Sequence, residues 1–279
     1  MEILNALTVD VEDWYHVCAV DEYLPQSRWD EYENRVNRNM EKVLDLLDRY
    51  GAKVTFFVLG YVAERNPDLV RKVFDAGHEV ATHGTFHQRL IDLTPDQFRE
   101  DLRRSVQILQ GITGVKPVGY RAPEWTVVRE SLWAFDILVE EGFLYDSSTV
   151  PLTLMGDRAL PRWPHRVTCR KGTILEFPAS TMRCLWENFP FTGGLPMRMS
   201  PYFFIVEGIK KANRLGYPAM VYTHPWEFDE NSPKLDLPFG RRFMHDYLRT
   251  STPRKIEGLL ARFRFGPIRD VLRLESGPA

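Results

Sequence analysis

The stretch "HEVATHGTFH" (residues 78–87) joins an apolar, strand-like run to two histidines that stand four positions apart. Val80 and Ala81 predict a buried strand at 78–83, and His83 and His87 follow at its end. Two imidazoles at i and i+4 can face one point when the segment turns helically, so they are candidate ligands of a metal ion. The alternative is that both are ordinary polar residues of a turn, because an HxxxH pattern alone is a weak signal.

Segments with strand and helix patterns alternate on both sides of this stretch. Apolar runs predict strands at 3–9, 53–60, 173–180 and 217–225, and strand ends in "PVGYRAP" and "FLYDSS". Caps and apolar stripes predict helices at 35–51, 66–77, 94–114 and 200–216, with a further one in "RESLWAFDILVEEG". Such alternation predicts a mainly parallel sheet, in which ligands gather at the carboxyl ends of the strands. Residues 150–172 are predicted to be an irregular excursion.

The composition narrows the class of protein. The chain has 279 residues, of which 44% are apolar, so it can bury one sizeable core. Its net charge of −2 gives no global reason to expect a nucleic-acid partner or an anionic membrane surface. Cys18, Cys169 and Cys184 predict no disulfide framework, which is typical of a reducing compartment. Apolar runs of transmembrane length and a signal-peptide pattern are both absent from the sequence, so we expect a cytoplasmic protein.

Polar residues follow the predicted strands at their carboxyl ends. In a barrel these ends converge on one mouth, where catalytic groups usually lie. Each residue alone has an ordinary explanation, since a lone acid after a strand is usually a turn residue or a helix cap. Their joint placement is what indicates a site. The residues are Asp10, Glu12 and Asp13 after the first strand, His83 and His87 after the third, Arg121 after the fourth, Asp146 after the fifth and His224 after the last.

The residue types suggest roles within such a site. A carboxylate beside the two imidazoles would complete a set of two nitrogens and one oxygen, which is typical of catalytic metal sites. Because side chains alternate along a strand, Asp10 and Glu12 share a face, whereas Asp13 joins them only if a bulge follows Asp10. Arg121 near Asp10 would keep that carboxylate ionised. His224 is a candidate proton donor at neutral pH, and the alternative is a hydrogen-bonded core histidine.

These residues lie in motifs that resemble those of the polysaccharide deacetylases of carbohydrate esterase family 4, the NodB-homology enzymes. The motifs are "TVDVED", "HGTFH", "YRAPEW", "YDSS" and "VYTHPW", which span residues 8–226 in the family's order. The chain is most similar to the branch encoded with bacterial exopolysaccharide and exosortase (PEP-CTERM) loci. The segments "NFPFTGGLPMRMSPY" and "LLARFRFGPIRDVL" resemble the C-terminal extension of that branch.

The resemblance implies a fold and an activity. The fold is a distorted (β/α) barrel of about seven strands over residues 1–233, with a C-terminal helical extension over residues 234–279 packed on it. The activity is hydrolysis of N-acetyl groups on amino sugars of a bacterial polysaccharide or its oligosaccharide precursor, with one divalent metal ion, usually Zn²⁺. The implied partners are an N-acetylated glycan and membrane-bound polysaccharide assembly machinery.

The resemblance also implies a role for each matched residue. The catalytic residues are Asp10 as general base, His224 as general acid, Arg121 as the residue that orients the base, and Asp146 by a looser match. His83 and His87 match metal ligands. The family's commonest first motif has two adjacent aspartates, so the third ligand is Glu12 or Asp13, with Glu12 favoured because it shares the face of Asp10. The tryptophan that usually lines the acetyl pocket has no clear counterpart after Asp146, which leaves the acyl group open.

Aromatic residues near the mouth are candidates for stacking on sugar rings. They are Tyr120, Trp125 and Trp226, with Trp14 and Tyr15 as further candidates. Core packing is the alternative for each of them. Two other functions are compatible with the pattern: an amidohydrolase of the same fold that acts on a small cyclic amide, and a carbohydrate-binding protein without catalysis. The joint presence of candidate base, acid and metal ligands argues against pure binding, which needs no such set.

Overall fold

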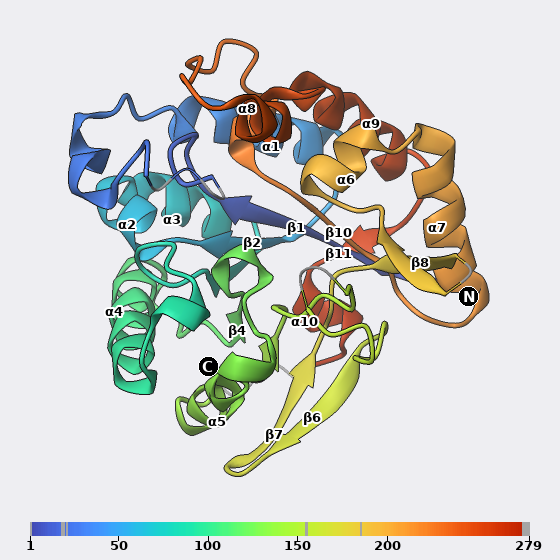
Figure 1. Ribbon diagram of the computed structural model, residues 1–279, viewed down its shortest axis with the longest axis horizontal. Helices are drawn as coiled ribbons and strands as arrows, with labels where there is room; N and C mark the ends of the chain where they lie inside the picture. The colour runs from blue at the N-terminus through green and yellow to red at the C-terminus, as the bar shows by residue number, and fades with distance from the viewer. Residues whose placement is uncertain (1, 18–19, 21, 154–155, 185, 275–279) are drawn as a thin grey trace.

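The computed structural model describes residues 2–17, 20, 22–153, 156–184 and 186–274. Cys18 lies outside the described residues, and Cys169 is a free thiol. Seven parallel strands of the described chain pair side by side, with helices around them (Figure 1). In spatial order they are β10 (Met220–Thr223), β1 (Asn5–Val11), β2 (Thr55–Val58), β3 (Glu79–Thr82), β4 (Gly119–Tyr120), β5 (Tyr145–Asp146) and β7 (Gly172–Glu176). The predicted α/β architecture, a distorted barrel of about seven strands, is confirmed.

Helices form in all five segments where caps and apolar stripes predict them, and two short α-helices, α2 (Gly60–Arg65) and α6 (Gly194–Met199), were not predicted. The α-helices are α1 (Val36–Arg49), α2 (Gly60–Arg65), α3 (Pro67–Asp75), α4 (Pro95–Thr113), α5 (Trp133–Glu140), α6 (Gly194–Met199), α7 (Tyr202–Arg214), α8 (Phe239–Asp246), α9 (Thr252–Leu260) and α10 (Ile268–Val271). Short 3-10 helices are η1 (Gln26–Glu31), η2 (Leu90–Asp92), η3 (Pro123–Trp125), η4 (Arg129–Ser131), η5 (Pro225–Phe228) and η6 (Arg249–Ser251). In α4, Thr94 and Gln97 form a reciprocal capping box, and Gly114 ends the helix in the left-handed conformation that glycine adopts readily.

Strand alternation sorts the side chains of the barrel into two sets. In β1, Leu7, Val9 and Val11 join the core that lies under the helices, whereas Ala6 joins the core inside the barrel. The inward set of β1 continues with Thr8, whose hydroxyl contacts Arg121 and Met220. The same alternation runs through the other strands, so inward positions at the carboxyl ends share one space.

Three segments differ from the prediction. Within residues 150–172, β6 (His165–Cys169) pairs antiparallel with β7, so this segment is not wholly irregular. A hairpin of β8 (Thr181–Cys184) and β9 (Glu187–Pro190) follows, and β11 (Phe265–Gly266) adds a short parallel pairing to β1. These strands are short and lie at edges or alternate exposed with half-buried positions, as β6 does, so their apolar signal in the sequence is weak.

The end of the chain closes the amino-terminal end of the barrel. In α10, the Ile268 N–H donates to Thr55 Oγ1 at 2.7 Å, and the Arg269 N–H donates to Glu79 Oε2 at 3.2 Å. Thr55 and Glu79 are the first residues of β2 and β3, so α10 lies opposite the carboxyl ends. The Ile268 side chain is fully buried in the barrel core. The division into a barrel over 1–233 and an extension over 234–279 stays a prediction.

Ile268→Ala should lower the free energy of unfolding by about 2–5 kcal/mol, because it removes a fully buried side chain and leaves a cavity in the barrel. Urea titration monitored by circular dichroism measures this loss. The half-exposed Ile91 provides a matched control, since Ile91→Ala should change stability by less than about 0.5 kcal/mol. Equal effects of the two substitutions would mean that α10 adds nothing to the stability of the barrel.

Candidate active site

Glu12, His83 and His87 converge at the carboxyl ends of β1 and β3. Glu12 Oε1 lies 3.2 Å from His83 Nε2 and 3.1 Å from His87 Nε2, and one donor atom from each residue lies within 4.8 Å of the others. All three residues are buried. Burial opposes the charge of Glu12, but His87, His224 and His83 hold the pKa of its carboxyl well below its usual range. The arrangement therefore offers two imidazole nitrogens and one carboxylate oxygen to a cation.

The two imidazoles meet by a route other than the helical turn considered for the sequence. Residues 83–87 form a bend in which Gly84 and His87 have φ of 75° and 53°. A Cβ on Gly84 would lie 2.8 Å from Asp101 Oδ2, so the bend also requires the small residue. His83 Nδ1 lies 2.8 Å from the Arg121 carbonyl oxygen, which only accepts, so Nδ1 carries the proton. The other ring nitrogen of His83, Nε2, faces Glu12 Oε1.

Asp10 and Arg121 form an ion pair inside the barrel. Arg121 Nη1 donates to Asp10 Oδ1 at 2.6 Å and to Thr8 Oγ1 at 2.8 Å. On its other side, Nη2 and Nε donate to the hydroxyl and carbonyl oxygens of Ser147. The guanidinium lies 4.1 Å from the ring of Phe57, and only 1% of Arg121 is exposed. The contact expected between Arg121 and Asp10 is therefore present as a buried ion pair.

His224 lies across the mouth from Arg121. Its Nε2 is 3.9 Å from Asp10 Oδ2, and its Nδ1 donates to Glu227 Oε2 at 3.1 Å. Burial alone would lower the pKa of His224, but the carboxylates of Glu12, Glu227 and Asp10 raise it to about 9. The ring is therefore protonated at neutral pH, as a general acid must be before it acts.

Glu227 was not singled out in the sequence. It is fully buried, and its Oε2 accepts from the Thr223 hydroxyl and the His224 N–H as well as from the imidazole. Its Oε1 accepts from the Thr252 hydroxyl at 3.1 Å, and the Arg198 Nε lies 3.6 Å away. The only sequence signal was an acid three residues after His224, which also fits a capping position. Thr252 begins α9, so a residue of the predicted extension contributes to the site.

Asp13 has a different place from Glu12. Its Oδ2 accepts from the N–H groups of Arg35 and Val36 at 2.7 and 2.9 Å, and its Oδ1 accepts from the Trp14 N–H. Burial raises the pKa of Asp13 to about 6, although these hydrogen bonds oppose the rise. Asp13 thus caps the start of α1, and of the two carboxylates considered, Glu12 lies beside the imidazoles.

Asp146 lies outside the cluster because it occupies the opposite face of β5. Tyr145 and Ser147 point into the barrel, whereas Asp146 lies beside Glu176 of β7, and burial and this neighbour raise the pKa of Asp146 well above its usual range. Ser148 Oγ donates to Asp146 Oδ1 and accepts from the Ala122 N–H at 2.7 Å. Through Ser148, Asp146 thus supports the backbone after Arg121 on the face of β5 opposite to the cluster.

The aromatic residues predicted to stack on sugar rings divide between the candidate site and the core. Tyr120 is fully buried on the outer face of β4 against Phe98 and Phe143, away from the mouth. Trp125 covers the Arg121 guanidinium at 4.8 Å. Trp226 stacks between the rings of His224 and His245, and its Nε1 is 3.4 Å from Glu12 Oε2, so both of its faces are occupied.

Trp14 and Tyr15 are also buried. They belong to an aromatic cluster below the first loop, with their rings 5.4 Å apart. Of the predicted stacking residues, Trp125 and Trp226 therefore lie at the site, whereas Tyr120, Trp14 and Tyr15 lie in the core.

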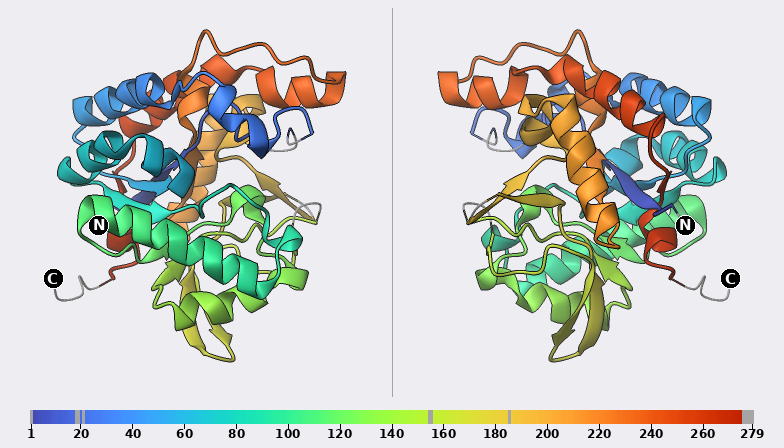
Figure 2. Two further views of the ribbon diagram at one scale, coloured as in Figure 1. Left: turned by 90° about the vertical axis from the view of Figure 1, so that its left-hand side faces the viewer. Right: turned by 90° about the vertical axis from the view of Figure 1, so that its right-hand side faces the viewer.

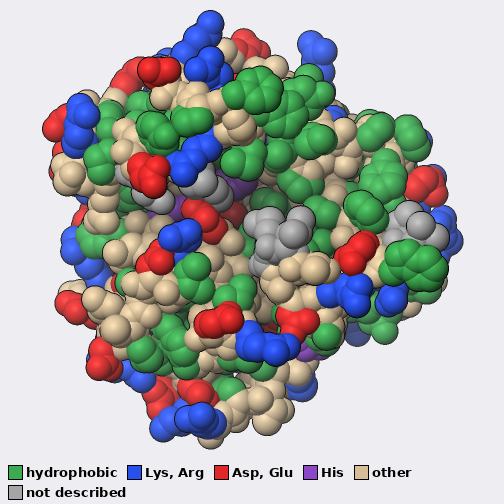
Figure 3. All heavy atoms as spheres, viewed as in Figure 1, with side chains coloured by type: hydrophobic (Ala, Val, Ile, Leu, Met, Phe, Trp, Pro, Cys, Tyr) green, Lys and Arg blue, Asp and Glu red, His purple; other side chains and the backbone are tan. Residues whose placement is uncertain are grey.

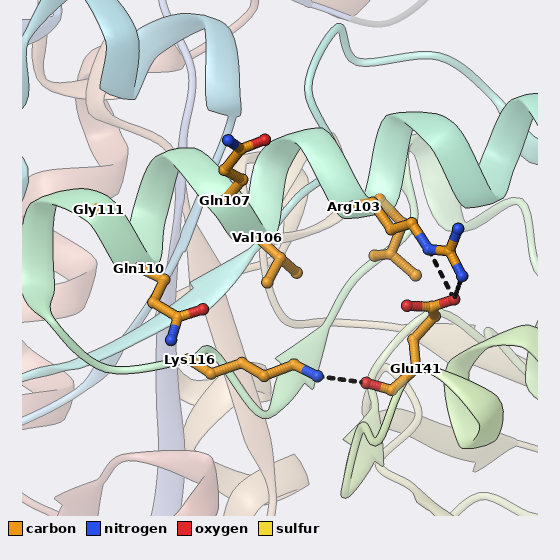
Figure 4. A pocket seen from close by; sticks show the side chains of 8 residues that line it. Arg103, Val106, Gln107, Gln110, Gly111, Lys116 and Glu141 are labelled. Carbon is orange, nitrogen blue, oxygen red and sulfur yellow. Dashed lines mark hydrogen bonds and ion pairs between the residues drawn. The ribbon is translucent and has the colours of Figure 1, made fainter.

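The surface is hollowed at this end of the barrel. Figure 3 shows histidine and acidic side chains together in a recess near the middle of the face. A separate depression of about 340 Å³ lies along α4, lined by Val106, Gln107 and Gln110 (Figure 4). Lys116 Nζ closes its rim by donating to the Glu141 carbonyl oxygen at 2.7 Å. Its lining includes none of the residues that converge on Glu12.

Two family models match adjacent segments of this chain. Residues 28–134 match the family model described as "Polysaccharide deacetylase". This segment is therefore similar to the polysaccharide deacetylase family. Residues 147–273 match a second model, described as "Domain of unknown function (DUF3473)". The peptidoglycan deacetylase of Helicobacter pylori is 30% identical over 154 residues, which cover 53% of this chain and 50% of that protein. The chain thus spans half or less of the curated relatives it matches first.

Solved structures share the fold. A Mycobacterium smegmatis protein described as a polysaccharide deacetylase superposes with a TM-score of 0.64 and 23% identity over 96% of this chain and 88% of that one. PuuE allantoinase gives a TM-score of 0.61 with 18% identity over 97% and 89% of the two chains. At such identities these similarities establish the barrel fold and leave the chemistry to the site residues.

Glu227→Gln should lower the pKa of His224 from about 9, because it removes one of the carboxylates that favour the imidazolium. An NMR titration of the ring protons measures this pKa without any substrate. The ordinary histidine value of 6.5 is raised here, so protonation of His224 stabilises the fold fully below pH 6.5. That stabilisation is lost as the pH rises through about 9 in the native protein, and at a lower pH in the variant.

The control is Glu187→Gln in the β8–β9 hairpin, which should leave the titration of His224 unchanged. A pKa that stays at about 9 in Glu227→Gln would mean that Glu12 and Asp10 hold the proton without Glu227.

Proposed function

We propose that this chain is a metal-dependent hydrolase that removes N-acetyl groups from amino sugars of a bacterial polysaccharide or its oligosaccharide precursor. The observation that carries the proposal is the meeting of Glu12, His83 and His87 beside the Asp10–Arg121 pair and His224. The family match of residues 28–134 and the relatives named as peptidoglycan deacetylases support it. Likeness of the five motifs to the exopolysaccharide branch is the ground for assigning the protein to exopolysaccharide biosynthesis in the cytoplasm.

The candidate ligands fit a divalent metal ion, and we propose Zn²⁺. Zinc ligands at about 2.0–2.1 Å in tetrahedral positions lie about 3.3 Å from one another. Glu12 Oε1 is 3.2 and 3.1 Å from the two imidazole nitrogens, which is near that separation. Three protein ligands leave a position open, as catalytic zinc sites do. When bound, such an ion polarises the acyl oxygen and lowers the pKa of water.

The remaining groups supply acid–base chemistry. Asp10 accepts a proton from the attacking water, and Arg121 holds the carboxylate in place through the 2.6 Å hydrogen bond. His224, protonated at neutral pH, donates a proton to the departing amine. The 3.9 Å between His224 Nε2 and Asp10 Oδ2 lets both groups reach one amide bond. Positioned acids and bases of this kind each contribute roughly 10²–10⁴-fold to the rate.

The rate of acetate release tests the proposed hydrolysis of N-acetyl groups. The wild-type protein should release acetate from N-acetylglucosamine oligomers, lose this activity with a chelator and regain it with Zn²⁺. Asp10→Asn should lower kcat at least about a hundredfold while the protein keeps its metal. The matched control is the exposed Asp92, whose change to Asn should leave kcat unchanged.

The same assay separates the rival functions. Turnover of small cyclic amides without acetate release from the oligomers would favour the alternative amidohydrolase. Oligomer binding without any turnover would favour a carbohydrate-binding protein.

His83→Ala should abolish metal binding without unfolding the chain, because it removes one of three donors. Elemental analysis of the purified protein, together with its melting temperature, measures both effects. His165→Ala in β6 is the control and should keep the full metal content. A full metal content in His83→Ala would remove this imidazole from the ligand set.

A further inference from the structure

The helix α8 presents apolar side chains to solvent. Within this helix, the buried residue is His245, whereas Phe239, Phe243 and Met244 are exposed. Phe239 is 86% exposed, which is unusual for a large aromatic ring on a soluble surface. The chain continues with exposed Tyr247 and Leu248, and the rings of Phe243 and Tyr247 stack at 4.5 Å. We call these five exposed side chains the α8 face. A helix packed on a core normally buries its apolar side chains and exposes its polar ones, whereas α8 buries a histidine and exposes its large apolar side chains.

The segment that carries the α8 face has a net positive charge. Residues 234–255 contain six Lys or Arg residues against two Asp, a net charge of +4 in a chain whose net charge is −2. Lys234, Arg242 and Arg254 are exposed among them. Large apolar side chains beside Lys and Arg are typical of helices that lie in the interface of a lipid bilayer. Anionic headgroups give such a surface a negative potential that attracts basic segments.

The helix is held firmly and lies next to the candidate active site. Arg198 of α6 donates to the carbonyl oxygens of Met244 and His245. The His245 ring stacks on Trp226, which in turn stacks on His224. Figure 2 shows α8 and the β8–β9 hairpin extending beyond the barrel on the same side, and the hairpin turn carries Trp186, which is 76% exposed. Tryptophan is enriched where proteins meet the membrane interface.

We propose that the α8 face docks the protein on the surface of an anionic lipid bilayer. Phe239, Phe243 and Met244 enter the headgroup region, and Arg242 and Arg254 pair with lipid phosphates. Within the part of the chain that the structure describes, none of the helices could span a bilayer. Because α8 lies beside His224, docking would hold the mouth of the site close to the lipid surface. The proposal does not depend on the enzymatic activity proposed above.

Cosedimentation with vesicles tests this surface. The wild-type protein should sediment with vesicles of equal parts phosphatidylcholine and phosphatidylglycerol, and much less with phosphatidylcholine alone. The double variant Phe239→Ser and Phe243→Ser should weaken binding by about tenfold or more, since it removes the inserted rings. The matched control is Val115→Ser with Leu215→Ser, two exposed apolar side chains on other elements, and should bind as the wild type does.

A second variant keeps the test decisive if the serine variant is unstable. Arg242→Glu with Arg254→Glu should weaken binding to the anionic vesicles, as should high sodium chloride, because both reduce electrostatic attraction. Wild-type protein that stays in the supernatant, or variants that bind like the wild type, would overturn the proposal. So would light scattering that shows a dimer which the Phe239→Ser, Phe243→Ser variant separates, since the α8 face would then pack against a second copy.

Discussion

The buried guanidinium of Arg121 is the constraint on which the mouth of this barrel depends. A cation that is 1% exposed is tolerated only when its donors are satisfied, and breaking such a buried pair typically costs about 3–5 kcal/mol. Arg121 meets this requirement with Thr8 and Asp10 of β1 and with Ser147 beyond β5. Its carbonyl oxygen also fixes the tautomer of His83. One residue therefore joins the carboxylate proposed as the base to the imidazole proposed as a metal ligand.

The other side of the mouth is built from the end of the chain. Glu227 lies between His224 and the hydroxyl of Thr252, so the orientation of the imidazole depends on the start of α9. Burial of Glu227 costs free energy that the hydrogen bonds from Thr223 and the His224 backbone offset. The carboxylate then raises the pKa of His224 together with Glu12 and Asp10. Residues after 233 are thus part of the electrostatics of the site as well as of its packing.

Strand alternation decides which of these features the sequence could predict. It predicts that Asp10 and Glu12 share a face, and in the structure both carboxylates lie close to His224. The same rule places Asp146 and Ser147 on opposite faces, and likewise Tyr120 and Arg121. It could not be applied to the sequence, because β4 and β5 are only two residues long and show no alternation of apolar and polar residues that would tell which side chains point inward. Glu227 could not be predicted because its partners Thr252 and Arg198 are distant in the chain. The β6 strand was missed because an edge strand with alternate exposed positions carries a weak apolar signal.

The site is a composite of the two segments that match family models. His83, His87 and Arg121 lie within 28–134, whereas His224 and Glu227 lie within 147–273, the segment described as having unknown function. The pair Asp10 and Glu12 lies outside both matches, in β1 and the residue just after it, and β1 is hydrogen-bonded between β10 and β2. The two carboxylates lie near the residues of both segments because β1 lies between β10, in the second segment, and β2, in the first. Neither segment alone contains all the residues proposed as base, acid and metal ligands, so the proposed chemistry requires both segments. The stack of His224, Trp226 and His245 extends this dependence to α8, because a shift of that helix would move a ring that also contacts Glu12.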